Sequence, residues 1–354
     1  MFWNLLLLLV VIIPTELIFG GWLGNNYGTL VIPRDVTRRF DVSDLYEDEK
    51  KIIKFTRDKN GFRGSRNNPS NIDILAVGGS STNEIFIDDN QTWTAVLEAS
   101  FQLSGKNISV VNGGVDGQST IGHLANFEYW YPKIPNFKPR YILFMIGIND
   151  IVISKSGYLS KQDKFFSSQG VLKQYILNNS AIYGLFRNFR GILRARNARL
   201  IHTMKGFDGY SWRTTTRQPS VEKAIFNYKT QLSTYRKRLE LLTKRTRDLG
   251  AIPIIVTQHD ATYRIKDNKV AGRVLGSGEV DYGNYAILAA HNRVAMKTCA
   301  DVGAICIDLF AGLLFDDGDH YDAFHTTPSG SSKIAKFLYQ KLRDRITVSS
   351  KITD

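Results

Sequence analysis

Short apolar runs that end at glycine recur along the middle of the chain. They span residues 72–77, 108–111 and 141–146, and they run into Gly78-Gly79, Asn112-Gly113-Gly114 and Gly147. An apolar run closed by glycine is typical of a buried strand that enters a tight turn. The polar residues after these runs are therefore expected at the carboxyl ends of neighbouring strands, where open α/β sheets bind ligands.

Helical patterns alternate with these strands. Apolar residues three and four positions apart run through 220–249 and stop at Gly250, which is typical of one amphipathic helix. Shorter helical patterns lie near 91–104, 119–131 and 284–301, and further strands are expected at 252–256 and 305–309. Alternating strands and helices predict a parallel sheet covered on both faces.

The first 24 residues form a separate apolar segment. Leu5–Ile13 is interrupted by Pro14 and Glu16, and the apolar run resumes at Leu17–Leu23. Its length of about 20 residues predicts a transmembrane anchor, shallow or tilted because a carboxylate is costly near the middle of a bilayer. A cleaved signal peptide is the alternative, although large residues stand two before each candidate glycine. The domains expected are an anchor or signal at 1–24, an extended lead-in at 25–70 and an α/β domain at 71–345.

Composition is compatible with this organisation. The chain has 354 residues, of which 43% are hydrophobic, enough for one sizeable α/β domain with an insertion. Cys299 and Cys306 lie seven apart without a metal-ligand spacing. We expect two small buried thiols, with a disulfide as the alternative in an oxidising compartment.

Positive charge is concentrated in residues 151–219, which interrupt the alternation of strands and helices. Twelve basic and two acidic residues leave this insertion at +10, against +13 for the whole chain. Within 172–200, apolar residues alternate with arginines such as Arg187, Arg190 and Arg194, a basic amphipathic pattern. It predicts either a lid helix with a solvated arginine face or contact with anionic lipid or an acidic glycan. Nucleic acid is not expected as a partner, because the anchor predicts an outward-facing domain.

Four polar stretches carry the candidate chemistry. They are Gly78–Thr82, Asn112–Gly117, Gly147–Asp150 and Asp322–His325. Together they supply a serine, hydrogen-bond donors and a histidine near a carboxylate. Acyl transfer at a serine needs a nucleophile, a base with an orienting group, and donors for an oxyanion.

In these four stretches, over roughly residues 55–345, the chain resembles the SGNH hydrolase superfamily of GDSL-like esterases and lipases. The resemblance implies Ser80 as nucleophile, Gly117 and Asn149 as oxyanion donors, His325 as general base and Asp322 as its orienting residue. It also implies a three-layer α/β/α sandwich around a flavodoxin-like five-stranded parallel sheet, and no cofactor or metal. Gly79 stands where the family usually has aspartate, a variant known among membrane-anchored bacterial members, and this departure bears on the substrate class.

The histidine has a local rival. The spacing Asp-x-x-His occurs twice, as Asp317/His320 and Asp322/His325. We prefer His325, because Pro328 and an amphipathic run follow it and predict the start of the last helix. A metal site in this acidic cluster is a weaker interpretation, because the cluster has neither a calcium-loop spacing nor a paired-histidine helix motif.

We therefore expect a serine esterase that removes acyl groups, chiefly acetyl, from a cell-envelope or exported glycan. An O-acyltransferase with the same residues and a lysophospholipase remain open, because the acyl-enzyme step is shared. A non-catalytic protein that binds glycan or lipid is disfavoured by the complete set of residues. The expected location is extracytoplasmic: anchored to a membrane, or secreted if the N-terminus is cleaved.

Overall fold

The computed structural model describes residues 2–20, 22, 32–65, 69–156, 179–183 and 210–347. Most of the basic insertion, including most of 172–200, lies outside the described residues, so the expectations for it stay predictions.

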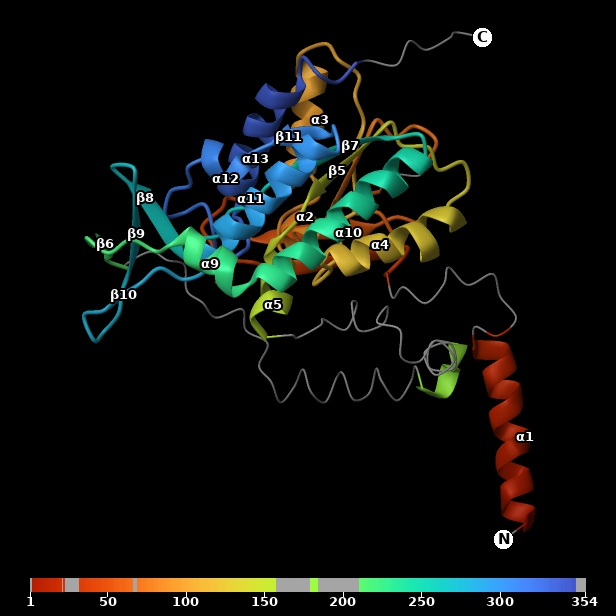
Figure 1. Cartoon of the computed structure of the whole chain (residues 1–354). Coiled ribbons are helices and arrows are strands. Elements are labelled where there is room, and N and C mark those ends of the chain that lie inside the picture. The colour runs from red at the N-terminus through yellow and green to blue at the C-terminus, as the bar shows by residue number, and fades with distance from the viewer. Residues whose placement is uncertain are drawn as a thin grey trace.

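A five-stranded parallel sheet forms the centre of the molecule, as predicted (Figure 1). Its strands are β3 (Ile74–Gly78), β4 (Val110–Asn112), β5 (Tyr141–Met145), β7 (Ile252–Val256) and β11 (Ile305–Ile307). Their spatial order is β4-β3-β5-β7-β11, all parallel. Numbered one to five along the chain, this order is 2-1-3-4-5, the flavodoxin-like arrangement.

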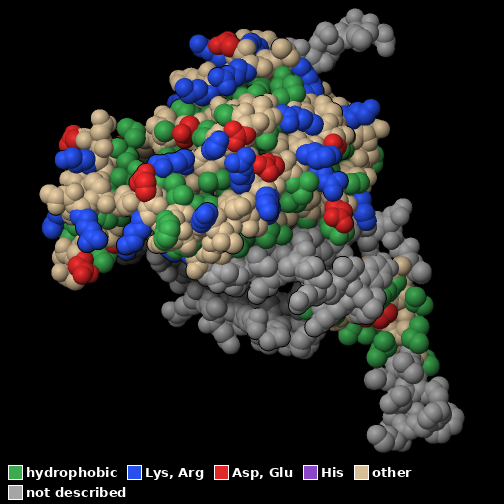
Figure 2. Space-filling view, in the orientation of Figure 1, with side chains coloured by type: hydrophobic (Ala, Val, Ile, Leu, Met, Phe, Trp, Pro, Cys, Tyr) green, Lys and Arg blue, Asp and Glu red, His purple; other side chains and the backbone are tan. Residues whose placement is uncertain are grey.

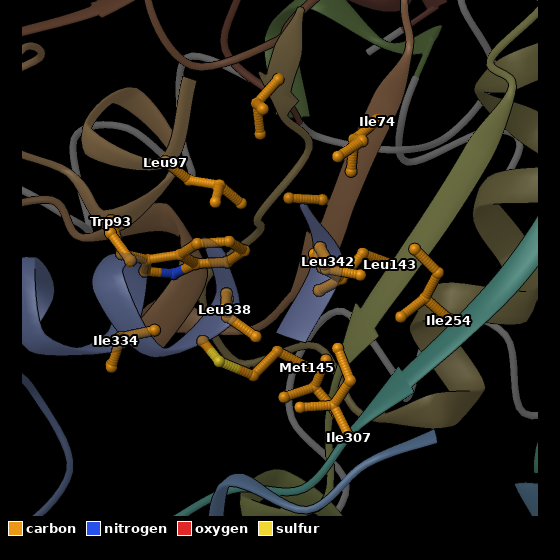
Figure 3. Close-up of a cluster of buried hydrophobic side chains, with 14 of the residues drawn as sticks. Ile74, Trp93, Leu97, Leu143, Met145, Ile254, Ile307, Ile334, Leu338 and Leu342 are labelled. Carbon is orange, nitrogen blue, oxygen red and sulfur yellow. The ribbon is translucent and has the colours of Figure 1, made fainter. Parts of the chain in front are cut away.

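Every residue of β3 and β5 is buried, because helices cover both faces of the sheet. On one face lie α3 (Trp93–Leu103), α12 (Leu309–Gly312) and α13 (Pro328–Leu342). Trp93, Leu97 and Leu338 from these helices meet Leu143 and Ile254 of the strands (Figure 3). These apolar contacts hold the helices on the sheet.

The opposite face is covered by α4 (Thr120–Tyr129), α10 (Lys229–Asp248) and α11 (Tyr285–Asp301). The 3-10 helix η1 (Tyr131–Lys133) follows α4. The single helix expected over 220–249 is divided into α9 (Val221–Asn227) and α10, because the chain leaves helical geometry at Tyr228. Helix α5 (Ile148–Ser156) follows β5 directly.

Several hairpin strands were not predicted. In the lead-in, β1 (Val36–Asp41) pairs antiparallel with β2 (Ile52–Arg57). A separate four-stranded antiparallel sheet contains β6 (Trp212–Thr214), β8 (Tyr263–Lys266), β9 (Lys269–Val274) and β10 (Val280–Asp281). It projects from one end of the central sheet (Figure 1).

The N-terminal apolar segment forms helix α1 (Phe2–Phe19), which continues through Pro14. Its 18 residues rise about 27 Å, slightly less than the ~30 Å hydrocarbon core of a bilayer. Within the part of the chain that the structure describes, no helix has both the length and the apolar character needed to cross a membrane. The anchor or signal expected at 1–24 stays a prediction from the sequence.

Glu16 of α1 contacts the basic insertion. Its carboxylate accepts hydrogen bonds from the Ser180 hydroxyl, the backbone N–H groups of Ala181 and Ile182, and the Trp22 indole. The hydrogen bonds from Ser180 and Trp22 lower the pKa of Glu16 to about 2. A charge that would be costly in a bilayer is thus paired with donors of the protein itself.

The two cysteines form a disulfide, which corrects the expectation of two free thiols. Cys299 at the end of α11 is bonded to Cys306 in β11, with 5.8 Å between their Cα atoms. The bond ties a helix to the edge strand that follows it. Structural disulfides are typical of proteins in oxidising compartments.

Candidate active site

The site lies at the point of the sheet where the order of successive strands reverses. β3 pairs with β5 although β4 comes between them in sequence, so the carboxyl ends of β3 and β5 lie side by side, with Gly78 opposite Met145. Ligands of open α/β sheets bind at such switch points. Ser80 follows β3 and Asn149 follows β5, so the topology itself brings the two residues to one edge.

Ser80 begins the short helix α2 (Ser80–Asn83), directly after the turn at Gly79. This strand-to-helix turn leaves its side chain partly accessible. The residue before this helix is Gly79, so no side chain caps its start. The Ser81 hydroxyl accepts a hydrogen bond from Gln258, 2.8 Å away, and Thr82 is fully buried.

Ser80, His325 and Asp322 form a hydrogen-bonded chain. His325 Nε2 lies 2.8 Å from Ser80 Oγ, and His325 Nδ1 lies 2.6 Å from Asp322 Oδ2. With the ring proton on Nδ1, the imidazole donates to Asp322 and Nε2 is free to accept the serine proton. The structure thus brings together the three residues predicted from the sequence, in the geometry of a nucleophile, a base and an orienting group.

Asp322 is held in its ionised form by its surroundings. Burial raises the pKa of its carboxyl, but the hydrogen bond and charge of His325, together with the N–H groups of Phe324 and His325, outweigh burial and lower it below its usual value. Both N–H groups donate to Oδ1 at 2.8 Å. An anionic Asp322 stabilises the imidazolium that forms when His325 takes a proton.

The rival pair Asp317/His320 has a different environment. Burial lowers the pKa of His320 to about 3, so the ring is neutral at physiological pH. Its ring packs against Phe315, with 4.7 Å between the centroids. Asp317 instead forms an ion pair with Arg264 at 2.8 Å. These contacts indicate that His320 stabilises the structure next to the site.

The acidic cluster around residue 317 is neutralised by basic side chains of the protein. Besides the pair between Asp317 and Arg264, Lys333 lies 2.5 Å from Asp316 and 2.6 Å from Asp319. Among the described residues, no group of three or more His, Cys, Asp or Glu side chains is arranged to hold a metal ion.

Asn149 lies in the first turn of α5, and its amide points at the loop after β4. Asn149 Nδ2 donates to the carbonyl of Gln118 at 2.8 Å. The neighbouring Gly117 has φ 73°, in the left-handed region that favours glycine. The two predicted oxyanion donors therefore come from adjacent segments next to Ser80.

Gly79 allows this approach. A Cβ atom at residue 79 would lie 2.4 Å from Asn149 Nδ2 and 3.3 Å from the carbonyl oxygen of Gln118. A side chain here would displace the amide of Asn149 or the turn before Ser80. The absence of a side chain at residue 79 is thus coupled to the position of a predicted oxyanion donor.

A second layer of polar residues, which the sequence analysis missed, holds these segments. Gln258 donates to Ser81 and accepts from the N–H of Ile148 at 2.9 Å, so it links α2 to α5. Asp150 accepts from Thr120 and Arg238, so it links α5 to the start of α4. Gln258 lies two residues after the end of β7, and the same reasoning about strand ends could have found it.

The lead-in also contributes to the site. Arg57 of β2 is buried, and its guanidinium donates to Asn83 of α2 at 2.7 Å and to the carbonyl of Gly114 at 2.6 Å. Asn83 in turn donates to Asp116. An arginine outside the predicted α/β domain therefore joins the turn after β3 to the loop after β4.

Comparison with known proteins finds matches among solved structures. The chain matches a structure of TesA with 14% identity and a TM-score of 0.44, over 77% of this chain and 98% of that one. An acetyl xylan esterase, AlAXEase, matches with 9% identity and a TM-score of 0.43, over 75% and 98% of the two chains. An acetylxylan esterase from Geobacillus stearothermophilus matches with 14% identity and a TM-score of 0.40, over 76% and 93%.

No protein-family model matches the chain, and no curated protein matches it. With identities this low and TM-scores below 0.5, the activity has to be argued from the geometry of the site.

Proposed function

We propose that the protein is a serine esterase that removes acyl groups, chiefly acetyl, from a cell-envelope or exported glycan through an acyl-enzyme. The observation that carries this proposal is the chain from Ser80 Oγ through His325 to Asp322, with contacts of 2.8 and 2.6 Å. These three hydrogen-bonded residues lie at the switch point of the sheet, beside the amide of Asn149.

In the acylation step, Ser80 Oγ attacks the ester carbonyl while its proton moves to His325 Nε2. The carbonyl oxygen becomes an oxyanion, and the donors proposed for it are the side-chain amide of Asn149 and the N–H groups of Gly117 and Ser80. When the intermediate collapses, the carbon–oxygen bond to the alcohol breaks and His325 protonates the departing alcohol. The acyl group remains on Ser80.

In the second step, a water molecule gives a proton to His325 as its oxygen attacks the acyl carbon. The bond to Ser80 Oγ breaks, and the proton on His325 returns to the serine. A sugar hydroxyl in place of water would make the same site an acyltransferase. Hydrolysis is the simpler assignment, and a test with an acceptor sugar separates the two.

The motif resemblance supports the proposed substrate class, and the disulfide supports the proposed location. An acylated glycan is the substrate that the resemblance favours, with a lysophospholipid as the competing lipid substrate. The Cys299–Cys306 disulfide supports an extracytoplasmic location.

The proposal is tested with the purified protein on p-nitrophenyl acetate and on esters of longer acids, each with and without an acceptor sugar. We expect hydrolysis that prefers the acetate, needs no acceptor and is lost in Ser80→Ala. Preference for long acyl chains would favour the lysophospholipase, and product formation only with the sugar would favour the transferase. Equal turnover by wild type and Ser80→Ala would contradict the site itself.

A further inference from the structure

Glu84 is a buried carboxyl to which the reaction steps assign no part. It is 4% exposed and follows α2, four residues after Ser80. Its Oε2 accepts from the N–H of Trp93 at 2.8 Å, and its Oε1 accepts from the Thr326 hydroxyl at 2.9 Å and from the Ser331 hydroxyl. One side chain thus holds the start of α3, the residue after His325 and the first turn of α13.

The backbone of Glu84 is tied to the other half of the site. Its N–H donates to the carbonyl of Ser80 at 2.7 Å and so closes the single turn of α2. Glu84 has φ 50°, the left-handed conformation that residues other than glycine rarely adopt. Such strain persists only where surrounding contacts hold it, and it occurs often at functional sites.

We propose that Glu84 is a positioning residue that sets the distance between Ser80 and His325, and that it does so in its ionised form; this inference rests on the proposed esterase function. Its backbone holds the serine turn, and its carboxylate holds the loop that carries the histidine. The 2.8 Å contact between His325 Nε2 and Ser80 Oγ bridges 245 positions of sequence, and the contact between Glu84 and Thr326 is a parallel link between the same two segments.

The ionised form makes the stronger contacts. One backbone N–H and two hydroxyls contact the carboxyl, and the two hydroxyls lie 2.9 Å from each other. Because a hydroxyl can donate or accept, a protonated carboxyl keeps its partners here. A carboxylate, however, receives charge-assisted hydrogen bonds, which are roughly twice as strong as neutral ones. Protonation therefore weakens the contacts that hold the loop of His325.

The surroundings of Glu84, chiefly its burial, place its protonation near neutral pH. Burial raises the pKa of Glu84 to about 7, against the hydrogen bonds of Ser331, Trp93 and Thr326 and the charge of Arg63, which lower it. The other titratable groups that interact with it are Tyr46 of the lead-in and Tyr321 of the histidine loop. The pKa of each phenol is raised mainly by burial, so both are neutral in this range.

The test compares wild type with Glu84→Gln, using p-nitrophenyl acetate across pH 5–9. Glutamine keeps the shape but carries no charge, and its amide nitrogen donates where a carboxylate oxygen accepts. We expect kcat to fall roughly 10- to 100-fold with KM within about twofold, as for a misplaced catalytic pair. In the wild type, protonation of Glu84 contributes to the fall of kcat on the acid side of the profile, and in Glu84→Gln this contribution is lost.

Asp73→Asn is the matched control. Asp73 is also buried, and it accepts from Ser109 and Arg140 at the far end of β3. Its substitution should lower Tm while leaving the shape of the pH profile intact. An unchanged kcat and pH profile in Glu84→Gln, or the same kinetic change in both variants, would overturn the proposal.

A second pair of variants keeps the test decisive if Glu84→Gln does not fold. Thr326→Val removes the hydroxyl that reaches Glu84 and should lower kcat, whereas Thr326→Ser restores it and should recover most of the activity. If Thr326→Val behaves as wild type, Glu84 does not act through this loop.

A measurement without turnover separates this inference from the proposed function. The NMR signal of the His325 ring proton shared with Asp322 should shift in Thr326→Val and not in Thr326→Ser. If the wild type hydrolyses no ester, the esterase proposal fails, while this signal still decides whether Glu84 positions the histidine loop. An identical signal in both variants would overturn the positioning role.

Discussion

At the residue scale, the absence of a side chain at Gly79 decides where a predicted oxyanion donor lies. A Cβ atom there would approach Asn149 Nδ2 to 2.4 Å, closer than such contacts occur, so the amide would have to move. We expect Gly79→Ala to lower kcat, as Asn149→Ala should. Loss of one oxyanion donor typically lowers kcat about 10²–10³-fold. KM should change little in either variant.

Gly276→Ala is the control for this prediction, because a Cβ there meets no atom within 4 Å. The kcat and KM of all three variants are measured by steady-state kinetics on a neutral ester. If Gly79→Ala keeps wild-type kcat, or if Asn149→Ala changes only KM, the amide has no part in stabilising the oxyanion.

The two histidines of the 317–325 segment should also differ sharply. His325→Ala removes the base that contacts Ser80 and should abolish nearly all turnover, since general bases contribute typically 10²–10⁴-fold. His320→Ala should retain most of the kcat, because its buried neutral ring packs on Phe315. Its cost should appear as a lower Tm in thermal unfolding. The opposite order of kcat would assign the base to His320.

At the element scale, apolar runs closed by glycine predicted the central sheet well. Strands buried on both faces have continuous apolar sequence, so β3, β5 and β7 could be recognised. The hairpin β8–β9 could not, because its sequence, Tyr263–Val274, mixes polar and apolar residues, with Asp267 and Asn268 at the turn. Short strands of this kind depend on their partners more than on their own residues.

The residues of the site could be predicted from the sequence to a similar extent. Ser80 and His325 are recognisable because each follows or precedes a clear element. The contact of Arg57 with Asn83 spans 26 positions of sequence and that of Glu84 with Thr326 spans 242, and no local pattern marks either one. The disulfide was missed for a related reason, since pairing needs the distance that the fold of α11 against β11 provides.

This disulfide should stabilise the fold without taking part in the reaction. It closes a loop of seven positions, which corresponds to about 2 kcal/mol in the chain-entropy account. We expect the double variant Cys299→Ser, Cys306→Ser to have a lower Tm and a kcat close to that of wild type, because the catalytic residues lie on other loops. Reductant should lower the Tm of the wild type and leave that of the double variant unchanged. Equal Tm values under all these conditions would contradict a structural role.

At the scale of the whole molecule, the charge is unevenly distributed. The face formed by α10 and α11 carries many Lys and Arg side chains with acids among them (Figure 2). Several are paired, as in Arg236–Glu240, Lys244–Asp248 and Lys297–Asp301. Of the net charge of +13, the insertion 151–219 holds +10, so the excess lies mainly outside the described residues.

The basic segment 172–200 therefore remains a prediction with its own test. Replacing Arg187, Arg190 and Arg194 together by Gln should weaken binding to anionic vesicles or to an acidic polysaccharide, and salt should reduce the advantage of the wild type. Hydrolysis of a small neutral ester should be nearly unchanged. Equal binding by both proteins at every salt concentration would leave the segment as a lid with a solvated face.

The most direct test of the account is to find the residue that reacts as the nucleophile. The folded wild type is treated with a fluorophosphonate, which reacts with activated serines, and the modified peptide is identified by mass spectrometry. Ser80 should carry the adduct, and the adduct should be absent in His325→Ala, because the serine is activated through the 2.8 Å contact with that ring. An adduct on Ser81, or no adduct on the folded protein, would contradict a serine esterase built on Ser80, His325 and Asp322.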